Sequence, residues 1–163
     1  MTALVYSATA MSIAMPQPLG VWHMGDAVSF VVAILCGPYI GMFSCGVGAM
    51  LFDIWNPIWG SSFLLYAPVT LLIRAAMGFL VGKFRLIFHE QPAQSEIIIM
   101  ILASAWKNLC YFLYDFYLFG SIAFLDLTTF FPLSAISIIL TVVLLISVRR
   151  TLKTDYLFSK RGV

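Results

Sequence analysis

One apolar stretch in the second half of the chain concentrates side chains suited to binding a small polar molecule. Lys107, Tyr111 and Asp115 are spaced four residues apart, and Tyr114 lies one turn beyond Tyr111. Residues at these spacings share one face of an α-helix, and Asn108 joins that face through Tyr111 and Asp115. An ammonium, an amide, a carboxylate and two phenols are the donors and acceptors that a pocket for a flat, polar ligand requires.

The elements that carry these side chains are predicted to be membrane-spanning helices. Hydrophobic residues make up 62% and charged residues 10% of the 163 residues, and the mean hydropathy is +1.01. Such values lie outside the range of soluble domains. At ~20 residues per spanning helix, the chain has room for about six spans. We therefore expect an all-α, polytopic membrane protein, a six-transmembrane-helix bundle in a single domain.

Turn-forming and hydrophilic residues set the expected bounds of these helices. Pro16 ends the first helix, because a proline disfavours helix at the residue before it, and Gly37-Pro38 separates the second helix from the third. The helices are expected at about 1–15, 26–36, 39–55, 63–82, 96–119 and 132–148, with a basic tail at 149–163.

The positive charges predict the orientation of this bundle. Lys83 and Arg85 lie in the connection between the fourth and fifth helices, and most other basic residues crowd the C-terminal tail. The connections that alternate to the other face hold Asp26 and Asp126 but no Lys or Arg. By the positive-inside rule, the basic connection, the tail and both termini are cytoplasmic. The stripe on the fifth helix then rises toward the outer surface.

Polar residues inside the spans allow two interpretations. Ionisable side chains in a membrane are costly, so they are candidates for function. In the first interpretation, the stripe lines an outward-facing pocket. In the second, Lys107 and Asp115 only neutralise each other or neighbouring helices. Arg74, in the fourth span, is expected to have a structural or partner-binding role; it could pair with Asp53 or Asp115 or hold an anionic group of a substrate.

The outer mouth offers further candidates for the same site. Trp22, His23 and Asp26 lie where an outer loop could close over a ligand. A lone histidine in such a loop is also typical of a solvated residue without a ligand. The three residues are therefore predicted to take part in binding if the loop covers the pocket.

Small residues predict where helices pack closely. Pairs spaced four residues apart allow helix backbones to approach each other in lipid. Three such pairs occur: Ala10 and Ala14, Gly37 and Gly41, and Gly78 and Gly82. Small polar residues on the sixth helix are expected to face the bundle: Ser134, Ser137 and Thr141.

Several chemistries have no motif in this sequence. It contains no GxxxxGK[ST], HExxH or GxSxG motif, and its three cysteines lack metal-ligand spacing. We expect no cofactor and no metal, and energy for any uphill transport must come from an ion gradient or another subunit. The net charge of +2 reflects topology and does not indicate nucleic acid.

An ordered set of motifs carries a family resemblance. Residues Gly25 to Ile54 read GDAVSFVVAILCGPYIGMFSCGVGAMLFDI, and Tyr66 to Gly82 read YAPVTLLIRAAMGFLVG. The GDA start, the GPxxG turn and a fourth helix with a Thr, a basic residue and spaced glycines follow in this order. The chain thus resembles the substrate-binding S components of energy-coupling factor (ECF) transporters, closest to the riboflavin and hydroxymethylpyrimidine group.

The resemblance implies a prokaryotic cell-membrane protein that binds a vitamin or its precursor from outside. It implies two kinds of partner, a transmembrane coupling subunit and two cytoplasmic ATPases, in addition to the lipid bilayer. By the family's motif, Ala10 and Ala14 would face the coupling subunit. The family's pocket corresponds here to Trp22, His23, Tyr66, Lys107, Asn108, Tyr111 and Asp115. Many relatives carry Asn-x-x-Gln on the sixth helix, where this chain reads FFPLSAISII, so the vitamin is not identified.

A different class of function is the alternative. An integral-membrane enzyme acting on a lipid-linked or amphipathic substrate would use Lys107, Asp115 and Arg74 as catalytic residues. Such enzymes usually cluster several acidic or metal-binding residues near one face, and the spans here contain few. We therefore expect a binding subunit and no enzymatic activity.

Overall fold

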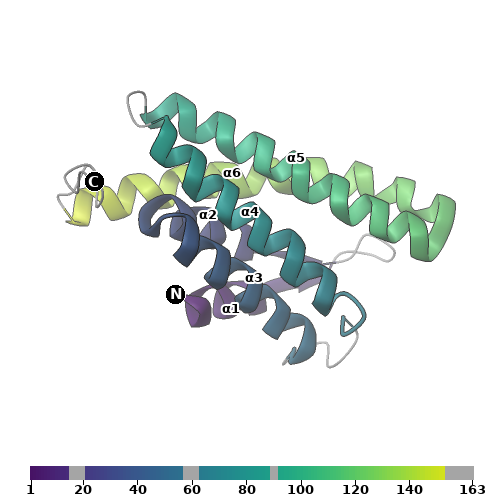
Figure 1. Cartoon of the computed structure of the whole chain (residues 1–163). Coiled ribbons are helices and arrows are strands. Elements are labelled where there is room, and N and C mark those ends of the chain that lie inside the picture. The colour runs from purple at the N-terminus through teal and green to yellow at the C-terminus, as the bar shows by residue number, and fades with distance from the viewer. Residues whose placement is uncertain (15–20, 57–62, 89–91, 153–163) are drawn as a thin grey trace.

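The computed structural model describes residues 1–14, 21–56, 63–88 and 92–152, without the side chains of residues 14, 21, 22, 92, 93, 126, 127 and 152. This part of the chain is mainly helical, which confirms the expected class (Figure 1). In chain order its elements are α1 (Thr2–Ala10), β1 (Ser12–Ala14), β2 (Val21–His23), α2 (Gly25–Cys36), α3 (Pro38–Ile54), α4 (Ala67–Ile87), α5 (Pro92–Phe119), the 3-10 helix η1 (Gly120–Ala123) and α6 (Phe124–Leu152).

Six α-helices are present in the described residues, as expected, but they differ in length. Three stretches are long and apolar enough to cross a membrane: Ala67–Ile87, Gln94–Ala123 and Thr128–Thr151. The apolar helices α2 and α3 are shorter, with 12 and 17 residues. At 1.5 Å per residue, α3 is about 25 Å long, a little less than the ~30 Å of a bilayer core.

The helices pack around a core formed mainly by α2, α4, α5 and α6. Figure 1 shows α5 and α6 as a long antiparallel pair, with α4 alongside α5. The helix α3 packs along α4, α1 packs on α3, and α2 contacts α3, α4 and α6. The core residues are Phe30, Ala33, Ile34, Met77, Val81, Ile99, Met100, Ala103 and Leu145. Lipid is as apolar as these side chains, so close packing, not exclusion from water, holds them together.

Glycines set the close approach of α3 and α4, in agreement with the close packing that the sequence predicts at these glycine pairs. A Cβ atom on Gly41 would lie 2.8 Å from the carbonyl oxygen of Gly78. A Cβ atom on Gly82 would lie 2.5 Å from the backbone nitrogen of Pro38. Gly37 has φ +86°, a conformation that favours glycine, and it turns the chain from α2 into α3. The small polar stripe on α6 faces the bundle, since its residues are all buried: Ser134, Ser137 and Thr141.

The predicted first helix is wrong beyond Ala10. Residues Ser12–Ala14 form β1, which pairs antiparallel with β2, and Ser12 lies opposite His23. Strand pairing satisfies the backbone groups of both segments, so it replaces the last helical turn that the apolar sequence suggests. Ala10 ends α1 and Ala14 lies in the strand, so the two alanines do not share a helical face. Pro16 lies outside the described residues.

Three later helices are longer than predicted. The helix α4 continues through Lys83 and Arg85, residues expected in a loop, and α5 begins at Pro92. Between α5 and α6 the chain reverses within the short η1, where Gly120 has φ +64°. The expected outer loop is therefore mostly helical, and Pro132 lies inside α6. Of the predicted basic tail, residues 153–163 lie outside the described part.

A buried carboxylate explains why α4 and α6 extend as far as they do. The carboxylate of Glu96, in the first part of α5, accepts from Nε of Arg85 at 2.6 Å. It also accepts from two nitrogens of Arg149, at 2.6 and 3.1 Å. Glu96 and Arg85 are buried, and the Arg149 side chain is 22% exposed. Because one acidic group pairs with a cation from each neighbouring helix, it ties α4, α5 and α6 together at one end.

Replacing Glu96 by glutamine is expected to destabilise the protein by on the order of 3 kcal/mol, because both arginines lose their charged partner while Arg85 stays buried. Thermal unfolding of the full chain in detergent measures this. Lys83→Gln is the control, since Lys83 is exposed at the same end and its change should move the free energy of unfolding by less than about 0.5 kcal/mol. Equal melting temperatures for Glu96→Gln and the native protein would contradict a tying role.

Candidate functional site

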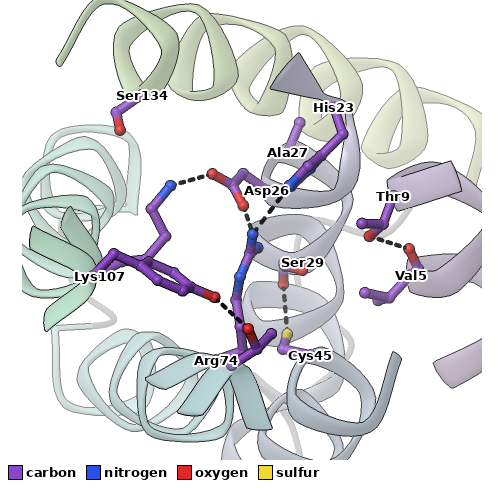
Figure 2. Close-up of polar contacts among 12 residues, drawn as sticks. Val5, Thr9, His23, Asp26, Ala27, Ser29, Cys45, Arg74, Lys107 and Ser134 are labelled. Atoms are coloured by element: carbon purple, nitrogen blue, oxygen red, sulfur yellow. Dashed lines mark hydrogen bonds and ion pairs between the residues drawn. The ribbon is translucent and has the colours of Figure 1, made fainter. Parts of the chain in front are cut away.

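A single carboxylate lies at the centre of the polar interior. Asp26 is in the first turn of α2. One of its oxygens, Oδ1, is bound by Nη1 of Arg74 from α4, and the other, Oδ2, is bound by Nζ of Lys107 from α5. Figure 2 shows the carboxylate between the two cations. The three side chains are 5–11% exposed, so this cluster is inside the bundle and away from lipid.

The β-hairpin brings a histidine to the same cluster. Nε2 of His23, at the end of β2, lies 3.3 Å from Nη2 of Arg74 (Figure 2). The imidazole packs beside the ring of Phe52, with centroids 6.2 Å apart. Gly25 allows the start of α2 to lie close to α1, since a Cβ atom there would lie 2.2 Å from Oγ1 of Thr9 and 3.0 Å from Nδ1 of His23. The hairpin is therefore anchored to α4 through His23.

Burial lowers the pKa of His23 from 6.5 to about 4, and the nearby Arg74 and Lys107 act in the same direction, whereas Asp26 opposes them. In the unfolded chain this pKa returns to about 6.5, so the unfolded state binds the proton more readily.

The stabilising effect of a neutral His23 is therefore complete above about pH 6.5 and is lost as the pH falls toward 4. We expect the melting temperature of the native protein to fall more steeply over this interval than that of His23→Gln, which cannot titrate. Melting curves of both proteins in detergent at pH 4.5, 5.5, 6.5 and 7.5 test this. Parallel curves would show that His23 stays solvated.

A second set of hydrogen bonds extends the cluster along α4 and α5. The hydroxyl of Tyr111 lies 3.1 Å from the hydroxyl of Thr70, and the phenol of Tyr111 lies close to the guanidinium of Arg74. Thr70 in turn contacts Asp53 of α3. A continuous polar path thus runs from Lys107 on α5 through the bundle to Asp53 on α3.

The polar stripe on α5 separates into three groups of contacts. Asn108 faces α6, where its amide nitrogen lies 3.0 Å from Oγ of Ser134. Asp115 accepts a hydrogen bond of 2.7 Å from Tyr66, just before α4. Tyr114 packs edge-on against Tyr66, with centroids 5.4 Å apart, and donates to a carbonyl of the same segment. Lys107 and Asp115 do not pair with each other. Each contacts a neighbouring element, Asp26 of α2 and Tyr66 before α4, which is the other arrangement that the alternative interpretation allows.

The structure brings together part of the predicted site. His23, Asp26 and Lys107 meet in one cluster, and Tyr111 lies next to it. The remaining candidates do not join this cluster. Asn108 contacts α6, and a separate group is formed by Tyr66, Tyr114 and Asp115. The side chain of Trp22 lies outside the described part.

Sequence reasoning missed two participants. Arg74 was expected to have a structural or partner-binding role, with Asp53, Asp115 or an anionic substrate group as possible partners, and its partner in the structure, Asp26, was not among them. Thr70 was noted only as part of the fourth-helix motif and was not expected at the site, although it lies four residues before Arg74 on the same helical face. That spacing was the available signal. Across the described residues, no three His, Cys, Asp or Glu side chains are placed to hold a metal ion.

Comparison with known proteins gives the context for this geometry. The family model "ECF-type riboflavin transporter, S component" matches residues 1–150. The chain is also 34% identical over 83 residues to an "Uncharacterized protein in gap 3'region" of Pyrococcus woesei. That match covers 50% of this chain and 51% of the other protein, so the chain spans about half the length of this curated relative. No solved structure matches the chain at a significant level.

The family match covers most of the chain, including every residue of the clusters described above. The family is one of transporter subunits, which excludes the alternative of a membrane enzyme, and it agrees with the resemblance seen from Gly25 to Gly82. This chain is a member of the family of ECF-type riboflavin transporter S components.

Proposed function

We propose that the chain is the substrate-binding subunit of an ECF-type uptake transporter and that it captures riboflavin, or a closely related vitamin, from outside the cell. Family membership supports the first part. The observation that carries the second is the buried cluster of Asp26, Arg74 and Lys107, with Tyr111 beside it. Charged side chains inside a membrane protein are costly and mark binding or transport sites.

The proposed topology is six crossings of a prokaryotic cell membrane with both termini in the cytoplasm. Basic residues gather at the end where α4 finishes and α5 begins, namely Lys83 and Arg85, together with Arg149 and Arg150 in the last turn of α6. The positive-inside rule assigns that end to the cytoplasm. The opposite end, where Tyr66 meets Asp115, then faces the exterior.

In this proposal the ligand passes an outer rim before it reaches the cluster. Tyr66, Tyr114 and Asp115 form the rim, where phenols and a carboxylate meet between α4 and α5. Deeper along α5, Tyr111 and Lys107 line the site. Asn108 borders it toward α6, and the hairpin with Trp22 and His23 covers it from the side of α2. On α5, each of these residues is one helical turn or less from the next.

The proposed partners are a transmembrane coupling subunit and two cytoplasmic ATPases. The sequence has no P-loop of its own, so ATP must be hydrolysed by another subunit. A contact with the coupling subunit remains a proposal for Ala10, a small, partly buried residue at the end of α1, and also for Ala14 in β1.

Ala10→Trp is expected to leave riboflavin binding by the purified chain unchanged and to abolish uptake in cells, because a large ring prevents close packing of α1 on its partner. Leu4→Trp is the matched control, since Leu4 is exposed on another side of α1. Normal uptake by Ala10→Trp would place the coupling interface elsewhere.

The proposed function itself is tested by transport. Cells that cannot make or import riboflavin are given this chain together with an ECF coupling subunit and its ATPases, and uptake of labelled riboflavin is measured. Uptake should require the chain and should stop when the ATPases are inactivated. The proposal would be refuted if riboflavin uptake continued without active ATPases, or if the cells took up no flavin at all.

A further inference from the structure

The charged cluster presents its groups in a fixed order. Lys107 and Arg74 donate to the two oxygens of the same carboxylate, and they come from α5 and α4 on either side of Asp26 (Figure 2). The order is therefore donor, acceptor, donor. Because the three groups come from three different helices, the packing of the bundle, and not one helix alone, sets their relative positions.

These groups keep hydrogen-bonding capacity that the described residues do not use. The ammonium of Lys107 has three N–H donors, and Asp26 takes one of them. Among the described residues, Nε of Arg74 is buried without a hydrogen-bond partner, as are Nδ1 of His23 and Oγ of Ser29, one turn from Asp26 on α2. Buried polar atoms are normally paired, so unpaired ones around a charged cluster indicate a binding site.

The order of the groups selects among ligand chemistries. A phosphate or a carboxylate would be attracted by the two cations but repelled by Asp26 between them. A cyclic imide, –CO–NH–CO–, offers acceptor, donor and acceptor along one edge, which complements the cluster. Its two carbonyl oxygens can accept from Lys107 and Arg74, and its N–H can donate to a remaining lone pair of Asp26.

We infer that this cluster recognises its ligand through the cyclic imide edge of a flat heteroaromatic ring. The inference rests on the proposed function, since the ring system of riboflavin ends in such an imide, and it assigns that end to the interior of the bundle. The aromatic ring of Tyr111, whose hydroxyl is held by Thr70, lies beside the cluster and provides a face for stacking. Asp26 then determines specificity.

The experiment compares riboflavin with N3-methylriboflavin, in which a methyl group replaces the imide proton. Quenching of flavin fluorescence by the full chain in detergent gives both dissociation constants. We expect the methylated flavin to bind at least roughly tenfold more weakly, because Asp26 loses its donor and meets a methyl group. In Asp26→Leu the ratio of the two constants should fall to about one. Asp115→Asn, which changes the rim, should alter both constants together and keep the ratio.

The outcomes separate this inference from the proposed function. If both flavins bind the native chain equally, or if the ratio survives in Asp26→Leu, the imide assignment is wrong while riboflavin binding stands. If riboflavin does not bind at all, the proposed vitamin is wrong and the imide assignment falls with it. Should Asp26→Leu fail to fold, the ratio measured for the native chain still decides.

Discussion

Lys107→Leu is expected to weaken riboflavin binding by roughly 10- to 100-fold, because a hydrogen bond to a charged group contributes about 1.5–3 kcal/mol. The fold should persist, since Asp26 keeps its contact with Arg74 when the lysine is removed. Equilibrium titration of the purified chain with riboflavin measures the change, and a melting curve of the same sample confirms folding. The loss of affinity would assign the ammonium on α5 to the ligand.

The matched control is Lys83→Leu. Lys83 is exposed in the last part of α4, near the end of the bundle where Glu96 lies, with its ammonium 5.6 Å from the ring centre of Phe79. The same change of residue type there should leave the dissociation constant within about twofold of the native value, since an exposed charge near the opposite end of the bundle is screened from the site. Equal affinities for native chain and Lys107→Leu would remove Lys107 from the site and favour a purely structural pairing.

The second large effect concerns stability and distinguishes the carboxylate of Asp26 from the guanidinium of Arg74. Asp26→Leu should destabilise the protein by roughly 3–5 kcal/mol, because it leaves two buried cations without an anion. Arg74→Leu should cost less, since Asp26 keeps Lys107 as its partner. The order of melting temperatures in detergent is therefore native, then Arg74→Leu, then Asp26→Leu. Asp26→Leu melting above Arg74→Leu would show that the carboxylate is not the common partner.

The double variant Asp26→Leu with Arg74→Leu sharpens this comparison. Residues in direct contact couple, so the combined loss of stability should be smaller than the sum of the two single losses. If the loss of stability in the double variant equals the sum of the two single losses within about 0.5 kcal/mol, the two side chains do not interact in the folded protein.

Composition and helical spacing predicted much of the fold. The helical class follows from composition, and the shared face of Lys107 and Tyr111 follows from spacing alone, because helical geometry fixes it locally. The glycine pairs that include Gly41 and Gly78 predicted close helix packing, since only small residues permit it, but the sequence did not indicate that α3 and α4 are the helices that meet. These features depend on a few neighbouring residues or on one pair of helices.

Other features depend on which distant segments of the chain contact each other, and local sequence patterns do not contain that information. The partner of Arg74 is 48 residues away on α2, and nothing in the sequence near either residue favours Asp26 over Asp53 or Asp115. The strand β1 was missed because three residues form it, and its partner β2 lies beyond Pro16. Arg85 was assigned to a loop for its charge, but Glu96 pairs with it and lets the helix continue.

The most direct test of the central claim is a titration of the purified full-length chain with riboflavin at neutral pH, without any coupling subunit. Saturable binding of one flavin per chain, weakened in Lys107→Leu and unaffected in Lys83→Leu, is the result we predict. A chain that stays folded, as its melting curve shows, and leaves flavin fluorescence unchanged at every concentration would contradict the assignment of this cluster to vitamin capture.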